Sequence, residues 1–244
     1  MSPRRTLATS GRVLRQLRHD KRTLALIFLL PCVLLVLVKY IFQSEQALFN
    51  SFAPMVLGIF PLIIMFLVTS IATLRERTLG TLDRLMVTPI SKLDFVLGYA
   101  LAFSLLALVQ ACLASFVVIE LLDVPVLAGV LPMLVGAVLA AFLGTAFGLF
   151  TSAFASSEFQ AVQFLPAFIF PQLLVCGLFV PREQMAKGLQ WFADVMPMSY
   201  SVDAMKQIAS HSYWTGALTR DLMVVVAFAL GVLVLGSITI RRQD

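Results

Sequence analysis

The sequence predicts an all-α protein that crosses a membrane six times, and three observations support this fold class. Of its 244 residues, 60% are hydrophobic and 13% are charged, whereas soluble domains have about 25% charged residues. The mean hydropathy is +0.95. Six apolar runs have the length of about 20 residues that a helix needs to span the hydrocarbon core. Most of the chain is therefore expected to be surrounded by lipid.

The six predicted spans are separated by short, more polar segments. Lys39 lies near the end of the first span, from which its ammonium can reach the headgroups. Pro166 and Pro171 predict a kink in the fifth. No removable signal peptide is evident, because a basic arm precedes a first span that is longer than a signal sequence. We treat residues 1–244 as one transmembrane domain with spans 24–42, 52–74, 95–119, 126–151, 161–181 and 221–240.

Lysine and arginine are distributed unevenly between the two sides of the predicted spans. The arm 1–22 contains seven, the segment 75–94 contains four and the C-terminal tail contains two. On the other side, 182–220 contains four, and 43–51 and 120–125 contain none. Cytoplasmic segments carry the excess of positive charge. The distribution therefore predicts that both termini and 75–94 lie in the cytoplasm. The membrane that we expect is a bacterial-type cell (plasma) membrane.

The basic arm 1–22 has the pattern of a helix that lies on a membrane surface. Leu7, Leu14 and Leu17 recur at roughly helical spacing, and arginines occupy the other faces. Such a helix binds the anionic inner leaflet. The alternative is a disordered arm that only fixes the topology. We expect no nucleic-acid partner, because the basic residues flank the spans and are not interleaved with aromatic residues.

Segment 182–220 is too polar to span the membrane and too apolar to be an open loop. Its composition predicts short helices at the outer interface. The aromatic residues within it fit the belt of tryptophan and tyrosine found at headgroup level. These residues are Trp191, Tyr200, Tyr213 and Trp214.

Motifs for catalysis and for phosphate binding are missing from the sequence. No glycine is followed by lysine, so there is no Walker A loop. There is no H-E-x-x-H, C-x-x-C or G-x-S-x-G motif, and the three cysteines lack metal-ligand spacing. No predicted span has a central charged residue, which a proton relay would need. We therefore expect a subunit that is not an enzyme, has no metal or cofactor of its own, and obtains any energy from another chain.

The fourth span carries small residues at every fourth position along one helix face. Small faces allow helix backbones to approach closely in lipid. We interpret this face as helix packing within the bundle, and the alternative is a seam between two copies. Its residues are Gly136, Ala140, Gly144 and Gly148.

The second and fifth spans combine aromatic rings, amides and prolines. Rings provide contact area and amides orient a ligand, so these spans suit a wall that contacts an amphipathic molecule. The alternative is that phenylalanine, which occurs 20 times, faces lipid. The candidate residues of a substrate path are Phe60, Phe66, Gln163, Phe164, Phe168 and Gln172.

Residues 75–93 give one apolar face when they are projected onto a helix. Pro89 predicts that this helix ends near Thr88. The helix either lies against the membrane or docks to a cytoplasmic partner. Gly80 favours docking, because a glycine inside a helix costs about 1 kcal/mol relative to alanine and is easier to explain where another backbone approaches. The apolar face consists of Leu79, Leu82, Met86, Ile90 and Leu93.

Three stretches make the sequence resemble the ABC-2 type permeases of ATP-binding cassette exporters, especially the daunorubicin-resistance-type branch. They are RERTLGTLDRLMVTPIS at 75–91, PREQMAKGLQWFADVMPMSYSVDAMKQI at 181–208 and RVLRQLRHDKRTLALIFLLP at 12–31. The resemblance covers essentially the whole chain. It departs from the family pattern at Thr78–Leu79, where many members have charged or aromatic residues.

The resemblance implies the ABC-2, or type V exporter, fold: six transmembrane helices, an N-terminal interfacial helix, a cytoplasmic coupling helix and short outer helices before the last span. It also implies two copies of a separate ABC ATPase that binds Mg-ATP, and a second permease, identical or related. In this family the segment after the second span lies in a groove of the ATPase and couples the two subunits. The residues that take this role by resemblance are Glu76, Arg77, Gly80, Thr81, Leu82, Asp83, Leu85, Thr88 and Pro89.

The hypothesis from the sequence is a permease subunit for efflux of an amphipathic drug-like molecule, as in antibiotic resistance, or of a lipid. The resemblance implies a substrate path at the seam between two permeases, lined by the second and fifth spans. One alternative keeps the fold and exports a cell-envelope glycan or a cofactor. Another is an intramembrane enzyme or scaffold without an ATPase, for which the sequence lacks a nucleophile and a base.

Overall fold

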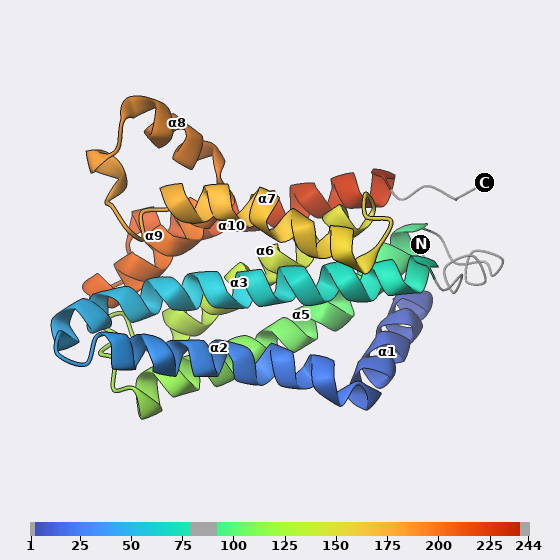
Figure 1. Ribbon diagram of the computed structural model, residues 1–244, viewed down its shortest axis with the longest axis horizontal. Helices are drawn as coiled ribbons and strands as arrows, with labels where there is room; N and C mark the ends of the chain where they lie inside the picture. The colour runs from blue at the N-terminus through green and yellow to red at the C-terminus, as the bar shows by residue number, and fades with distance from the viewer. Residues whose placement is uncertain (1–2, 79–91, 240–244) are drawn as a thin grey trace.

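The computed structural model describes residues 3–78 and 92–239, which form helices and no β-strand (Figure 1). Six helices in this part of the chain are long and apolar enough to cross a membrane, which confirms the predicted all-α polytopic fold class. They are α2 (Lys21–Ile41), α3 (Gln46–Thr78), α5 (Lys92–Phe116) with its π-helical continuation η1 (Val117–Leu121), α6 (Val130–Ser152), α7 (Glu158–Val175) and α10 (Gly216–Thr239).

Shorter elements lie at the two ends of the bundle. Helix α1 (Pro3–His19) lies across one end, where α3 and α10 also finish, and we call this the α1 end (Figure 1). The opposite end, the α8 end, contains a 3₁₀ turn, η2 (Arg182–Gln184), and the helices α8 (Lys187–Val195) and α9 (Pro197–Ser210). The start of α1 and the ends of α3 and α10 therefore share one side of the bundle.

Helix α3 is the centre of the bundle. It packs against α2, α5, α6, α7 and α9, and most of its apolar side chains are buried. By contrast, only 17%, 22% and 28% of the apolar stretches of α2, α7 and α10 are buried, as expected of helices that face lipid. The buried residues form two main apolar clusters along α3, one that includes Met65 and Phe103 and another that includes Leu57 and Met133.

The small residues of α6 lie inside the chain, where α6 and α3 approach each other closely. A Cβ atom at Gly144 would collide with the carbonyl oxygen of Leu62, and one at Gly148 would lie 2.5 Å from that of Phe66. Ala140 between them is fully buried. This face of α6 therefore packs against helices of its own chain.

Several helix ends differ from the limits of the predicted spans. Helix α3 continues to Thr78, because neither glycine nor proline interrupts it after Pro61. Helix α7 stops at Val175, six residues before the predicted limit, and Gly177 follows with a φ of 89°, which favours glycine. Helix α10 begins at Gly216 rather than at 221.

Candidate functional site

At the α1 end, a single arginine joins α1 to both α3 and α5. The Nη1 atom of Arg12 lies 3.2 Å from Oε2 of Glu76, and its Nη2 atom donates to the hydroxyl of Tyr99 at 2.8 Å. The Glu76 and Tyr99 side chains are buried. Removing the cation from a buried carboxylate of this kind is strongly destabilising. These three side chains therefore hold the three helices together as one unit, which we call the Arg12 network.

Close to the Arg12 network, the packing of α1 against α5 depends on small side chains. Thr9 and Val13 lie on the buried face of α1. A Cβ atom at Gly98 of α5 would lie 2.6 Å from Cβ of Thr9, so a glycine there lets the two helices touch. The basic arm is thus helical, but Leu7, which was expected on its apolar face, is 61% exposed.

Two more arginines attach the last turn of α3 to neighbouring helices. Arg75 pairs with Glu158 at the start of α7 through Nε to Oε1 at 2.7 Å and Nη2 to Oε2 at 3.0 Å. Arg77 donates from Nη1 to the carbonyl oxygen of Ser152 at the end of α6. Any displacement of this turn will therefore act on α1, α6 and α7 together.

Two of the nine predicted coupling residues lie in the part of the chain that the structure describes. Glu76 and Arg77 belong to the last turn of α3, which continues past residue 74, the predicted limit of the second span. Glu76 points inward to Arg12, and Arg77 is half-buried. The other seven, Gly80, Thr81, Leu82, Asp83, Leu85, Thr88 and Pro89, lie outside the described residues.

A pocket of about 180 Å³ lies between α1, α2, α3 and α5 beside the Arg12 network. Asp20, Arg75 and Glu76 line its polar part, and Leu67, two turns earlier on α3, lines its apolar part. Asp20 caps α2 by accepting hydrogen bonds from the amide and hydroxyl of Thr23 at 3.1 Å and 2.6 Å. These bonds lower the pKa of Asp20, so its carboxylate is charged at neutral pH. The pocket therefore presents charge next to an apolar wall.

The candidate residues of the substrate path are not gathered in one place. On α3, Phe66 is fully buried in the core and Phe60 is half-buried. On α7, Gln163 is exposed, Phe168 is 39% exposed, and the ring of Phe164 lies 6.1 Å from that of Phe168. Phe66 is thus a core residue in this structure, and Gln163 and Phe168 lie at the surface of the bundle.

Gln172, the sixth candidate, has a structural role in this arrangement. Its Oε1 atom accepts from the backbone amide of Met198 at 3.3 Å, and its Nε2 atom donates to the carbonyl oxygen of Phe168 at 2.9 Å. The side chain is 4% exposed. Gln172 therefore joins α7 to the start of α9.

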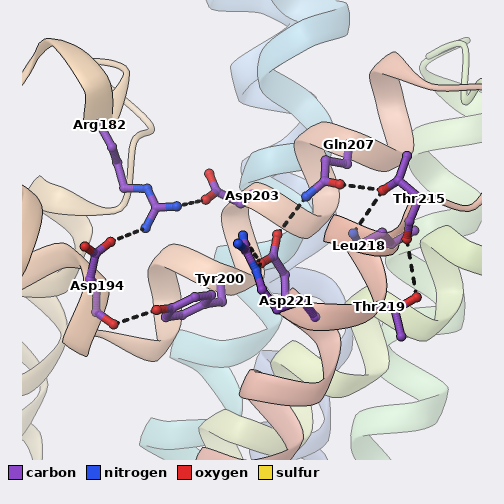
Figure 2. A network of polar contacts seen from close by, with 10 residues as sticks. Arg182, Asp194, Tyr200, Asp203, Gln207, Thr215, Leu218, Thr219 and Asp221 are labelled. Atoms are coloured by element: carbon purple, nitrogen blue, oxygen red, sulfur yellow. Dashed lines mark hydrogen bonds and ion pairs between the residues drawn. The ribbon is translucent and has the colours of Figure 1, made fainter.

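A second polar network lies at the α8 end (Figure 2). Arg182 pairs with Asp203 of α9 and with Asp194 of α8, where Nη1 lies 3.3 Å from Oδ1. The hydroxyl of Tyr200 donates to the carbonyl oxygen of Asp194 at 2.7 Å. This set, the Arg182 network, attaches the segment that contains η2 and α8 to α9.

The polar contacts continue from α9 to the start of α10 (Figure 2). Gln207 donates from Nε2 to Oδ2 of Asp221 at 2.7 Å and accepts at Oε1 from the hydroxyl of Thr215 at 2.6 Å. Arg220 contacts the other oxygen of Asp221, with Nη2 at 2.8 Å from Oδ1. The Asp221 carboxylate is buried, and these donors satisfy both of its oxygens.

The sequence also matches a known protein family. Residues 5–210 match the family described as ABC-2 type transporter. The chain belongs to this family. The match covers α1 through α9 and so includes both the Arg12 network and the Arg182 network.

Individual ABC-2 type relatives are more distant. The chain is 28% identical to the probable multidrug ABC transporter permease YbhR of Escherichia coli over 64% of this chain and 42% of that protein. It is 28% identical to ABC transporter G family member 20 of Dictyostelium discoideum over 58% of this chain and 19% of that protein. It is 27% identical to the inner membrane transport permease YhhJ of Escherichia coli over 57% of this chain and 38% of that protein. The chain thus spans less than half the length of each of these relatives.

Sequence reasoning missed the central residues of both networks in this ABC-2 type chain. Arg12 was counted only as one positive charge of the arm, yet its partner Glu76 is 64 residues away. Arg182 and Asp203 lie 21 residues apart. These residues lie in or beside the stretches that carry the family resemblance, but the sequence gives no information about which of them pair.

Proposed function

We propose that this ABC-2 type chain is the membrane-spanning permease subunit of an ATP-binding cassette exporter. Its cargo is an amphipathic drug-like molecule or a lipid, taken from the cytoplasm or the inner leaflet. The family match over residues 5–210 carries the proposal. The relative YbhR, which is named as a probable multidrug ABC transporter permease, supports this class of cargo.

The proposed source of energy is a separate ABC ATPase that binds Mg-ATP on its own chain. The absence of a Walker A motif from this sequence supports a separate ATPase. We propose that two ATPase copies act on two permeases, of which the second is identical or related, and that both termini are cytoplasmic. The substrate path would then lie at the seam between the permeases.

The proposed coupling segment is residues 75–89, and the geometry of its first turn supports this role. Glu76 pairs with Arg12 of α1, and the same arginine donates to Tyr99 of α5. Arg75 and Arg77 are bonded to α7 and α6. A movement of the segment that follows Thr78 would therefore reach five helices, since α3 itself moves as well.

The proposal is tested by expressing the chain together with a candidate ABC ATPase, to be identified by a Walker A motif in a reading frame near its gene. The two proteins are purified and reconstituted in lipid vesicles. Gly80→Leu is expected to reduce co-purification of the ATPase, because the coupling residues would meet it directly. Glu76→Gln is expected to leave co-purification intact and to reduce cargo-stimulated ATP hydrolysis about tenfold, since it weakens a charge-assisted hydrogen bond.

Glu183→Gln is the matched control, because Glu183 is an exposed acid at the opposite, α8 end. It should change neither measurement. Export of a fluorescent amphipathic dye from the vesicles should require ATP and both subunits. If Gly80→Leu and Glu76→Gln both behave like Glu183→Gln, the coupling assignment is wrong. If the pair of subunits hydrolyses ATP but moves no amphipathic compound, the proposed cargo is wrong.

A further inference from the structure

A second pocket, of about 320 Å³, lies at the α8 end between the end of α2, the start of α3 and η1. It is distant from the Arg12 network, which lies at the other end of the bundle (Figure 1). Its wall combines apolar side chains with one amine, two amides and one phenol. The lining residues are Val36, Lys39, Tyr40, Gln43, Gln46, Leu121 and Leu122.

Lys39 supplies the positive charge of this pocket. Its Nζ atom donates to the carbonyl oxygen of Leu122 at 2.8 Å and lies 5.8 Å from the centre of the Phe49 ring. No ion pair within residues 3–78 and 92–239 includes Lys39. An ammonium group has three donors, and the carbonyl uses one of them. Lys39 can therefore donate to an anionic oxygen inside the pocket.

The π-helical turn explains why a carbonyl is free to hold Lys39. In η1 the hydrogen bonds reach one residue further than in an α-helix, and the amide of Leu122 bonds to the carbonyl of Val117 at 3.0 Å. The chain then turns at Asp123, whose φ is 53°. The carbonyl of Leu122 lies beyond the last helical turn and accepts from Lys39 instead of from the backbone.

Two carboxylates are close in sequence to residues that line this pocket. Glu45 lies in sequence between the lining residues Gln43 and Gln46, and Glu120 directly precedes Leu121. Both glutamates are exposed, and neither belongs to an ion pair in the described part of the chain. Lys39, by contrast, is half-buried within α2. The site therefore has a positive charge in its wall, and two exposed carboxylates adjoin wall residues in the sequence.

We propose that this pocket binds a zwitterionic phospholipid whose headgroup carries a primary ammonium, of the phosphatidylethanolamine type. The phosphate accepts from Nζ of Lys39 and from the side-chain amides of Gln43 and Gln46. The ammonium lies toward Glu45 and Glu120, and an acyl chain lies along Val36 and Leu121. A headgroup with a phosphate but no amine leaves the two carboxylates unmatched and adds repulsion.

The lipid would bind from the outer leaflet, because the distribution of lysine and arginine predicts that the α8 end faces outward. A polar pocket at the end of membrane-spanning helices lies at headgroup depth, where Lys39 can reach lipid phosphate. The apolar Val36 lies one turn deeper on α2 than Tyr40, toward the acyl chains. These positions favour a lipid over a soluble phosphate compound.

The test is native mass spectrometry of the purified full chain with three added lipids that have identical acyl chains and ethanolamine, choline or glycerol headgroups. The ethanolamine lipid should be retained best. Lys39→Gln should reduce its retention about tenfold, because a charge-assisted hydrogen bond to phosphate is lost. The double variant Glu45→Gln/Glu120→Gln should remove the preference over the glycerol lipid. Lys187→Gln on α8, an exposed lysine at the same end, is the matched control and should change nothing.

Lys39→Arg keeps the cation, so it should retain the lipid. Retention by this variant would show that the loss in Lys39→Gln comes from the missing charge and not from misfolding. Soluble glycerophosphoethanolamine at equal concentration should not displace the lipid; displacement would show that the headgroup alone is bound and would overturn the assignment to a lipid. Equal retention of all three lipids, or unchanged retention in Lys39→Gln, would also overturn the proposal. No ATPase or transport is involved, so this result is independent of the proposed exporter function.

Discussion

At the scale of single residues, Asp203 shows how the fold changes the chemistry of a side chain. Burial raises the pKa of its carboxyl group from 3.8 to about 6, although Arg182 acts in the opposite direction. Asp221 and Glu183 add to the increase in pKa, and Lys206 opposes it. The folded chain therefore binds a proton at Asp203 more tightly than the unfolded chain does.

This shift predicts that acid stabilises the α8 end. The stabilisation from Asp203 is fully present below about pH 4 and is lost as the pH rises through about 6, because the folded pKa is the higher one. Between pH 5 and pH 8 we expect a loss of about 1 kcal/mol in the free energy of unfolding, since the side chain keeps some contact with water. Thermal unfolding in detergent at a series of pH values measures it.

Asp203→Asn has no charge to titrate, so its stability should not show this pH dependence. Asp194→Asn is the control, because Asp194 contacts the same arginine but its side chain is 61% exposed. Its pH dependence should match that of the parent chain. The assigned direction of the pKa shift would be wrong if the parent chain became more stable from pH 5 to pH 8 and Asp203→Asn removed that increase.

At the scale of elements, the contact between α3 and α6 is decided by backbone proximity. The glycines of α6 place its backbone against carbonyl oxygens of α3, with no space for a side chain at Gly144. Without water in the hydrocarbon core, such close packing is a main source of helix association. This contact determines the position of α3, and with it that of the Arg12 network.

Gly144→Ala is expected to destabilise the chain by about 1–3 kcal/mol, because the new methyl group must push two backbones apart. Gly231→Ala in α10 is the matched control. No atom lies within 4 Å of a Cβ built at Gly231, so this change should be neutral or slightly stabilising. The thermal midpoints of the two variants in the same detergent give the comparison. Equal midpoints would mean that α6 and α3 do not pack this closely.

At the scale of the whole molecule, the bundle has two chemically different ends. The α1 end holds the arginine-rich α1 and the last turn of α3, and the α8 end holds the short helices α8 and α9 (Figure 1). The family match makes the chain a multi-pass membrane protein. The distribution of lysine and arginine then predicts which end faces the cytoplasm.

This topology predicts which introduced cysteines react in intact cells. Lys187→Cys on α8 should be labelled by a membrane-impermeant maleimide added outside. Arg4→Cys on α1 should be labelled only after the membrane is permeabilised, because α1 is expected inside. Both positions are exposed, so accessibility depends on the side of the membrane alone. Mass spectrometry of the labelled peptides provides the measurement, and labelling of Arg4→Cys in intact cells would show the reverse orientation.

The fold class and much of the helix layout were accessible from the sequence for a physical reason. In lipid a helix satisfies its own backbone hydrogen bonds, so about 20 apolar residues are enough to predict a span without knowledge of its neighbours. The predicted second span ends at residue 74, where the charged residues begin, whereas α3 continues to Thr78. The bonds of Glu76 and Arg77 to other helices in this turn could not be predicted from the sequence.

By itself the sequence determined the apolar spans, the row of small residues on α6 and the uneven distribution of positive charge, because each of these is a local property of the chain. Only the tertiary structure decided that Arg12 meets Glu76 and Tyr99, that Arg182 meets Asp203, and that Lys39 lines a pocket with Leu121 and Leu122. These partners come from distant segments. A charge gains its partner only when helix packing brings the two side chains together, and no local pattern encodes that distance.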